Sequence, residues 1–200
     1  MSSVSGTYGQ INYTTAGEGF PLILVPDSAD AMVDWAQQMP LLGELCRVIA
    51  YEAGSSQQRM SWSYDADLDT LTTVLDALMI ERTYLAGYAN GAMAALHTAL
   101  QSPARVEALL LLGMDDAVQT LALTELTVPT CIFVGANCPS HRATATRLGT
   151  QIPHCATITI PGAGAIPHQE QPWSLGHAMM DFLIHCERQR NLVRGASFLL

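Results

Sequence analysis

Residues Leu85–Leu96 read LAGYANGAMAAL and join an apolar segment, residues 82–88, to a stretch with helical spacing. Small residues stand two positions before and two positions after one central residue, which is the pattern of a nucleophile elbow. Gly87 and Gly91 allow a strand and a helix to approach closely around that residue. The central residue is Ala89, whose methyl group cannot attack a carbonyl. The stretch therefore predicts a strand–turn–helix unit that carries no nucleophile.

The other apolar runs predict a parallel sheet with helices between its strands. Short continuous apolar runs are typical of strands buried on both faces. They occur at residues 21–25, 47–51, 82–88, 106–112, 130–134 and 156–160. Segments with helical spacing alternate with them, at 65–80, 89–101, 142–152 and 172–186. Residues 10–15 alternate apolar and polar, which predicts a half-buried edge strand. The alternation indicates a doubly wound, mainly parallel α/β sheet of about six to eight strands flanked by helices.

Length and composition favour one domain with a partner. Two hundred residues suffice for one α/β domain, expected over residues 1–187 and followed by a C-terminal tail, residues 188–200. Only 14% of the residues are charged and 49% are hydrophobic, so few charges remain to cover the surface. We therefore expect a protein partner or a second copy of the chain. The net charge of −9 argues against binding to nucleic acid.

The cysteines and the N-terminus predict a cytoplasmic protein. Five cysteines occur without CxxC pairs or zinc-type spacing, which favours buried thiols in a reducing compartment. The first ten residues lack a basic and an apolar region, and no apolar run reaches the roughly 20 residues of a membrane-spanning helix. We expect no membrane insertion, no metal and no cofactor.

Five segments follow one another in a familiar order. They are PLILV (21–25), with Asp34-Trp35 nine residues later; RVIAY (47–51); residues 75–113, which contain the elbow; LTVPTCIFVGANCP (126–139); and IPGAGAIPHQEQP (160–172). On these segments, the chain resembles the α/β-hydrolases of the esterase, epoxide hydrolase and haloperoxidase-like group over residues 11–186. The resemblance implies the α/β-hydrolase fold. Residues 114–128 are too few for the cap domain that many members insert at this point, so a capless member is expected.

The resemblance also implies catalytic groups that this sequence lacks. Members usually carry a serine at the elbow, an acid after a later strand and a histidine in a GAGH-like turn. The matching positions hold Ala89, Cys138 and Ala165. The usual histidine-glycine pair after the first parallel strand is Pro26-Asp27 here. All four departures together predict a hydrolase fold that has lost hydrolase activity and serves as a binding, scaffolding or accessory subunit.

The oxyanion hole is also in doubt. The amide of Asn90 could still donate a hydrogen bond, and the second donor would come from about Ser28. A negative charge on Asp27 would disfavour an oxyanion beside it. Two alternatives stay open: a lyase, cyclase or isomerase that uses Asp27, Cys138 or His168 as acid–base groups, and a receptor for a small apolar ligand.

Two sets of residues are candidates for binding. The ligand-binding candidates are Asp27, Ser28, Tyr88, Asn90, Cys138 and His168. An inert thiol at Cys138 and a structural role for His168 are the competing interpretations. The partner-binding candidates are Arg188, Arg190, Arg194 and Phe198, which follow the last predicted helix. A frayed terminus is the alternative there.

Overall fold

A computed structural model gives the fold of the chain. It describes residues 2–7, 9–27, 35–52, 64–115, 118 and 121–197, with side chains described except at 64–67 and 193–197. The sequence also predicts a helical stretch with Met32, Trp35 and Met39 on one face and a polar loop over residues 54–63. The first lies largely, and the second wholly, outside these ranges. Ser28, Asp34 and Phe198 lie outside them as well.

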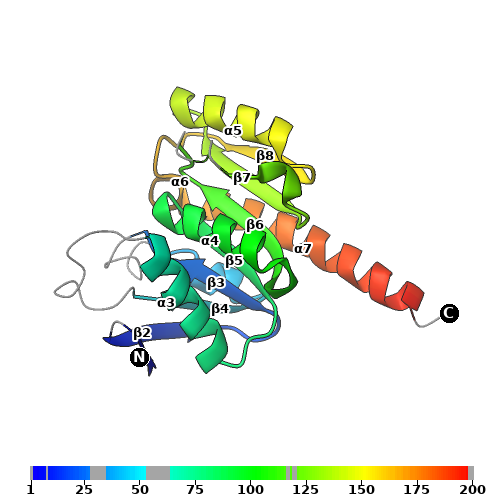
Figure 1. The fold of residues 1–200 in the computed structure, drawn as a ribbon. Helices are drawn as coiled ribbons and strands as arrows, with labels where there is room; N and C mark the ends of the chain where they lie inside the picture. The colour runs from blue at the N-terminus through cyan, green and yellow to red at the C-terminus, as the bar shows by residue number, and fades with distance from the viewer. Residues whose placement is uncertain are drawn as a thin grey trace.

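Eight strands form one twisted sheet (Figure 1). They are β1 (Ser2–Gly6), β2 (Gly9–Ala16), β3 (Pro21–Val25), β4 (Arg47–Tyr51), β5 (Thr83–Tyr88), β6 (Val106–Leu112), β7 (Thr130–Gly135) and β8 (Cys155–Ile160). Their order across the sheet is β1-β2-β4-β3-β5-β6-β7-β8. Strand β2 pairs antiparallel with β1 and β4, and the remaining pairs are parallel. The predicted mainly parallel, doubly wound sheet is confirmed.

The position of β2 corrects one prediction. Residues 9–16 do not form the edge of the sheet, because β1 pairs with β2 along its outer side. The β1 sequence SSVSG holds a single large apolar residue, Val4, so its strand character is invisible in the apolar pattern. Pairing with a neighbouring strand, and not its own composition, makes this segment extended.

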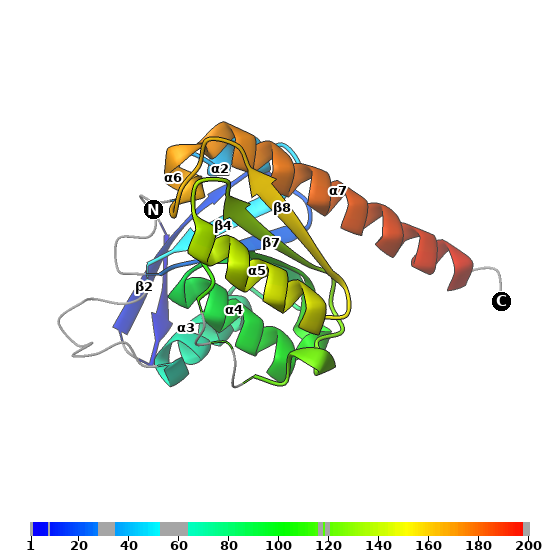
Figure 2. The same ribbon diagram turned by 90° about the horizontal axis from the view of Figure 1, so that it is seen from above.

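Helices cover both faces of the sheet (Figure 2). They are α2 (Met39–Leu42), α3 (Tyr64–Ala77), α4 (Asn90–Gln101), α5 (Pro139–Gln151), α6 (Pro167–Glu170) and α7 (Pro172–Ser197), with 3₁₀ turns η1 (Pro103–Arg105) and η3 (Leu123–Glu125). Helices α3, α4 and α5 pack with one hydrophobic cluster, and α2 and α7 pack with the other. The sheet therefore separates two cores, as a doubly wound fold requires.

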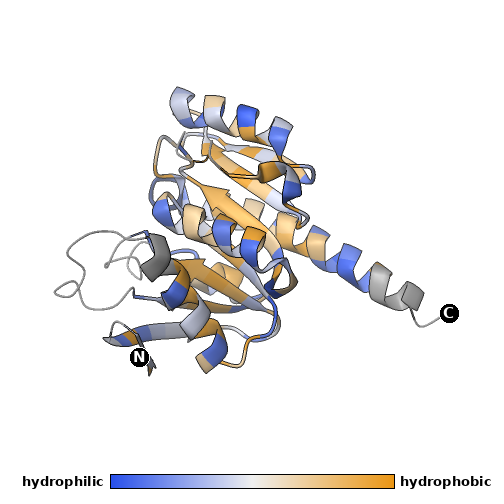
Figure 3. Cartoon of the chain, viewed as in Figure 1, coloured by the Kyte–Doolittle hydropathy of each residue, from blue (hydrophilic) through white to orange (hydrophobic). Residues whose placement is uncertain are grey.

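Strand β3 shows why the continuous apolar runs are diagnostic. Leu22 and Leu24 belong to the cluster under α7, whereas Ile23 and Val25 belong to the cluster under α4. Alternate side chains thus enter opposite cores, and all four are at most 1% exposed. Figure 3 shows the same continuous hydrophobic character in the central strands.

Two helices are longer than the sequence predicts. Helix α5 begins at Pro139 and not at residue 142, because proline at the first helical position needs no hydrogen-bond acceptor for its nitrogen. Helix α7 does not end near Cys186 but continues to Ser197, so most of the expected C-terminal tail is helical. In the described part of the chain, no helix is both long and apolar enough to cross a membrane.

The link between β6 and β7 is short. Residues 113–129 make this connection and include only the 3₁₀ turn η3 among their described helical elements. A separate cap domain needs many more residues than this, so none is inserted at this point. The carboxyl edge of the sheet, where α/β proteins build their sites, is consequently bordered by the loops after β3, β5, β7 and β8.

Candidate functional site

Ala89 occupies a strained turn between β5 and α4. Its backbone angles are φ 47° and ψ −112°, a conformation that side chains with a Cβ rarely adopt. The N–H of Ala89 donates to the carbonyl of Leu112 at 3.0 Å, and its carbonyl accepts from the N–H of Met93 at 3.1 Å. These hydrogen bonds hold the elbow geometry although Ala89 has no reactive group.

Gly87 and Gly91 make the elbow possible. A Cβ added to Gly87 would lie 2.4 Å from the carbonyl carbon of Gly91, and one added to Gly91 would lie 2.4 Å from the carbonyl oxygen of Val25. Real Cβ atoms do not approach other atoms so closely, so both positions require glycine. The predicted close approach of strand and helix is confirmed.

Asp27 contacts the first residue of α4. Its Oδ1 accepts a hydrogen bond from the backbone N–H of Asn90 at 2.9 Å. Asn90 follows the elbow residue, so its N–H is the donor that an oxyanion hole would use. A carboxylate beside the first turn of a helix is favourable, because free N–H groups point toward it there. The structure thus brings two predicted ligand-binding candidates, Asp27 and Asn90, together. The carboxylate of Asp27 accepts the hydrogen bond that the Asn90 N–H would otherwise offer to an oxyanion.

Cys138 is buried at the amino end of α5. Its exposed fraction is 9%, and its Sγ lies 3.5 Å from Oγ of Ser140, a weak contact in the same turn. The loop around it is fixed to the neighbouring loop, because Asn137 N–H donates to the carbonyl of Ala163 at 2.8 Å. Cys138 therefore stands between the carboxyl end of β7 and the start of α5.

The vacated histidine position lies in a loop held by Glu170. The Glu170 carboxylate accepts hydrogen bonds from the N–H groups of Gly164 and, at 3.0 Å, Ile166. These hydrogen bonds to the ionised form, mainly that of Ile166, lower the pKa of Glu170. Ala165, between the two donors, is exposed. The loop keeps an ordered shape without the histidine.

His168 is packed into an aromatic cluster. Its ring stacks on Trp35, with 5.0 Å between centroids, and lies 4.7 Å from the ring of Tyr88. The imidazole is 2% exposed, and its backbone carbonyl accepts a hydrogen bond from Nε2 of Gln38 at 2.5 Å. Tyr88 also covers Gly113, where a Cβ would lie 2.4 Å from the tyrosine ring. These contacts support a structural role for His168.

The arginines of the last helix have different surroundings. The guanidinium of Arg190 lies 4.2 Å from the ring centroid of Phe20 and 3.1 Å from the carboxylate of Glu187. Its side chain is only 11% exposed. Arg188 is exposed, whereas the side chain of Arg194 is outside the described set. Of the predicted partner-binding residues, Arg190 is engaged within the chain and Arg188 is exposed.

The thiols are free in the described structure. Four cysteines are buried and Cys155 is half-buried. Burial raises the pKa of Cys46 to about 12, and that of Cys155 and Cys186 to about 11. A raised pKa keeps these thiols protonated and unreactive near neutral pH. Among the described residues, no group of three or more His, Cys, Asp and Glu side chains is arranged to hold a metal ion.

Several contributors to this region were not among the predicted site residues. Trp35 and Gln38 fix the histidine segment, and Glu170 shapes the loop at residues 163–166. Glu170 lies close in sequence to its donors, so its capping role could have been inferred from the local pattern. The contact between Gln38 and His168 joins residues 130 positions apart, which only the folded chain reveals.

The strand order, the antiparallel β2 and the elbow after β5 define an α/β-hydrolase fold. No family model matches the chain. A 2-hydroxymuconate semialdehyde hydrolase from Pseudomonas sp. (strain CF600) is 36% identical over 110 residues, which cover 51% of this chain and 39% of that protein. The chain thus spans about two fifths of the length of this relative.

Two solved structures share the fold. A mutant meta-cleavage product hydrolase from Pseudomonas fluorescens IP01, in complex with acetates, superposes with a TM-score of 0.81 at 19% identity, covering 92% of this chain and 98% of that one. The enol-lactonase from Burkholderia xenovorans LB400 gives a TM-score of 0.80 at 13% identity, covering 92% and 100%. The chain therefore has the α/β-hydrolase fold, and over about half of its length it is similar in sequence to a named hydrolase.

Proposed function

We propose that this chain is a pseudo-hydrolase: an α/β-hydrolase-fold protein without hydrolytic activity that acts as a binding, scaffolding or accessory subunit. The observation that carries the proposal is the hydrogen bond from Asn90 N–H to the Asp27 carboxylate. Ester hydrolysis by this fold depends on donors that stabilise a developing oxyanion. Here one such donor already holds a negative group supplied by the chain itself.

The electrostatic cost of hydrolysis at this site is large. An oxyanion forming beside Asn90 would have to displace the Asp27 carboxylate or approach it closely. Two unit charges 4 Å apart repel by about 4 kcal/mol at the effective dielectric of a protein surface. Removing one oxyanion-hole donor from an active enzyme already costs about 3–4 kcal/mol. The Asp27 carboxylate therefore opposes the transition state as well as occupying its donor.

The three triad positions offer no substitute chemistry. Ala89 has no nucleophilic atom, and Ala165 has no base. The thiol of Cys138, at the acid position, lies 3.5 Å from the hydroxyl of Ser140, which is too weak a base to deprotonate it. A cysteine nucleophile needs a base or a positive environment. Catalytic side chains are missing at several positions at once. This supports a natural loss of hydrolysis over a single inactivating substitution.

The alternative functions have less support. A lyase, cyclase or isomerase would need Asp27, Cys138 and His168 to act on one ligand. Asp27 is engaged by Asn90, Cys138 contacts Ser140, and His168 is packed between two aromatic rings. A receptor for a small apolar ligand is the other alternative, and the half-buried ring of Tyr88 beside the elbow is the side chain that would contact such a ligand.

The preserved architecture supports a binding role. Gly87 and Gly91 still provide the close strand–helix packing, and Glu170 still shapes the loop of the missing histidine. Function belongs to sites and not to folds, so an intact scaffold can serve recognition after its chemistry is lost. The free thiols fit a reducing, cytoplasmic setting.

Restoring the nucleophile tests the proposal. The wild-type protein and Ala89→Ser are assayed with p-nitrophenyl acetate and p-nitrophenyl butyrate. We expect both to match the rate of buffer alone, because serine at the elbow still lacks a base and a free oxyanion hole. Turnover by Ala89→Ser that is at least tenfold above wild type would show that the rest of the machinery is intact, and would contradict the proposal.

A further inference from the structure

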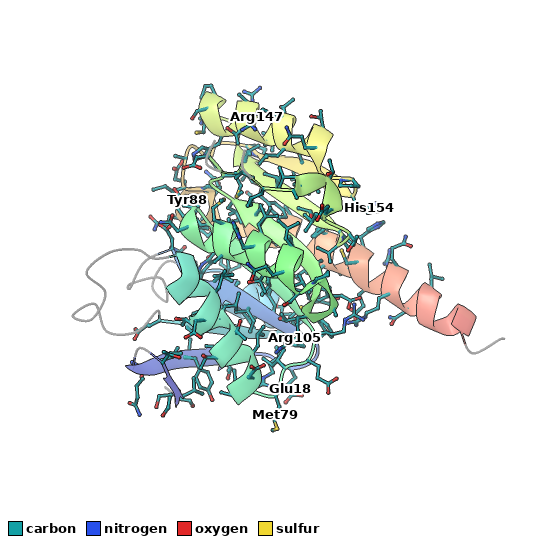
Figure 4. The ribbon with its side chains drawn as sticks, viewed as in Figure 1. Glu18, Met79, Tyr88, Arg105, Arg147 and His154 are labelled. Carbon is teal, nitrogen blue, oxygen red and sulfur yellow. The ribbon has the colours of Figure 1, made fainter. Side chains whose placement is uncertain are left out.

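Helix α3 ends at an exposed apolar groove. The groove has a volume of about 500 Å³ and is lined by Leu75, Asp76, Met79, Ile80, Glu81 and Arg105. Leu75 and Ile80 form its buried floor. Met79 is 89% exposed and points away from the body of the molecule (Figure 4). The groove therefore combines an apolar floor, a protruding methionine and carboxylates at its rim.

Met79 is unfavourable for the isolated fold. Its φ is 53°, the left-handed region in which glycine is preferred. The N–H of Ile80 donates to the carbonyl of Leu75 at 2.8 Å, which closes the helix in the way that usually places glycine at this position. The side chain gains no burial in return. Met79 therefore offers a large apolar side chain, on a strained backbone, to any surface that covers the groove.

The end of α7 has the complementary chemistry. Figures 1 and 2 both show this helix continuing past the sheet, so its last turns project from the body. Leu192 in this part is 67% exposed, and Arg188 is exposed. Arg190 fixes the base of the projection to Phe20. The projecting end thus exposes the apolar Leu192 and the cation Arg188, on a helix that Arg190 attaches to the body of the molecule.

Charge complementarity indicates a second copy as the occupant of the groove. Residues 188–200 hold three of the nine arginines and none of the eighteen acidic residues, which gives this segment +3 and leaves −12 on residues 1–187. Asp76 and Glu81 at the groove rim are exposed acids. A carboxylate oxygen of Asp76 forms an ion pair with the guanidinium of Arg105 at 2.9 Å, whereas Glu81 has no partner among the ion pairs described. A basic, apolar helix end fits this rim.

The geometry allows the contact between two chains. Met79 and Glu81 lie just before β5, and Arg105 lies just before β6, so the groove is at the amino edge of the sheet. Helix α7 reaches the same edge, because Gln189 and Arg190 line a cavity together with Arg82 and Val106. The helix then leads away from its own body. Two copies facing each other at this edge can therefore exchange helix ends.

We propose that the projecting end of α7 in one copy docks on the Met79 groove of a second copy, and that a two-fold axis makes the exchange reciprocal. Leu192 packs against Met79, and Arg188 faces Glu81. This inference does not rest on the proposed loss of hydrolysis: a monomeric protein would overturn it and leave that proposal untouched.

Sedimentation velocity with the full chain at micromolar concentrations tests the inference. We expect a species of twice the 21.5 kDa chain mass that dissociates as salt is raised, because the contact is partly electrostatic. Leu192→Asp should raise the dissociation constant at least tenfold. Trp173→Asp is the matched control: Trp173 is 66% exposed at the other end of α7, and this variant should still dimerise. A monomeric wild type, or a dimer unaffected by Leu192→Asp, would overturn the inference.

Met79→Gly separates binding from folding. Glycine relieves the positive φ, so the melting temperature of the monomer should rise, while dimerisation should weaken at least tenfold. Glu81→Arg and Arg188→Glu should each weaken the dimer, and their combination should restore it in part. Unchanged dimerisation in Met79→Gly, or no recovery in the combined variant, would contradict this docking surface.

Discussion

Asp27 and Asn90 form the central contact of the vacated site: the Asp27 carboxylate accepts a hydrogen bond of 2.9 Å from the Asn90 backbone N–H. The acid comes from the loop after β3, and the amide opens helix α4. The contact therefore joins the two segments from which an oxyanion hole would be built. The carboxylate of Asp27 thus places a negative group of the protein itself on this N–H.

Neutralising Asp27 should destabilise the protein. In Asp27→Asn the amide of Asn90 loses a charged acceptor, and the positive end of the α4 dipole loses its counter-charge. We expect a loss of about 1 kcal/mol in the free energy of unfolding, measured by urea denaturation. Asp181→Asn, at an exposed position in α7, removes the same charge and should change stability by less than about 0.5 kcal/mol. Equal effects of the two variants would show that the hydrogen bond contributes nothing.

Replacing Ala89 by glycine should stabilise the fold. A non-glycine residue in this conformation costs about 1–3 kcal/mol, and glycine loses roughly 0.5–1 kcal/mol through the freedom of the unfolded chain. The net gain expected in Ala89→Gly is about 1 kcal/mol by the same denaturation measurement. Ala95→Gly, inside α4 at a buried position of regular helix, should instead cost about 1 kcal/mol. Destabilisation of Ala89→Gly would mean that the strain inferred from φ 47° is absent.

Glu170 should make stability depend on acid pH. Its pKa is lower in the folded protein than its ordinary value of 4.5, so the folded state favours the ionised form. This stabilisation is complete above pH 4.5 and is lost as the pH falls through the folded pKa. Glu170→Gln should therefore melt at a lower temperature than wild type at pH 7, and the difference should shrink below pH 4.5. A difference that stays constant down to pH 3 would contradict this account; Glu44→Gln, at another exposed carboxylate, is the control.

Arg190 and Arg188 should behave differently although they lie on the same helix. Arg190→Ala removes the contact with Phe20, the ion pair with Glu187 and buried packing. We expect a loss of about 2 kcal/mol of unfolding free energy. Arg188→Ala changes an exposed side chain and should alter the stability by less than about 0.5 kcal/mol under conditions where the chain is monomeric. Similar losses in both variants would show that the burial of Arg190 contributes little.

Local patterns predicted most of the fold. The apolar runs at residues 21–25, 47–51 and 106–112 coincide with strands β3, β4 and β6, because burial on both faces demands continuous hydrophobicity. The close approach of β5 and α4 was also predictable, because the spacing of Gly87 and Gly91 is typical of a nucleophile elbow. Strand β1 was missed because pairing with β2, and not its own composition, holds it in place. The last turns of α7 were missed because residues 188–200 were predicted to be a tail.

The candidate site was predictable only in part. The positions of Ala89, Cys138 and Ala165 followed from motifs, but the hydrogen bond between Asp27 and Asn90 spans 63 residues of sequence. The aromatic contacts of His168 depend likewise on Trp35, which lies far away in the chain. Such contacts are set by how the loops meet at the sheet edge, and no local pattern encodes them.

We propose that this chain does not hydrolyse esters, and steady-state turnover by the wild-type protein tests this most directly. The rate with p-nitrophenyl butyrate is measured over a range of protein concentrations, beside Cys138→Ala and Asp27→Asn. The account predicts a rate equal to buffer for all three proteins at every concentration. A rate that rises in proportion to wild-type protein and disappears in Cys138→Ala or Asp27→Asn would contradict it.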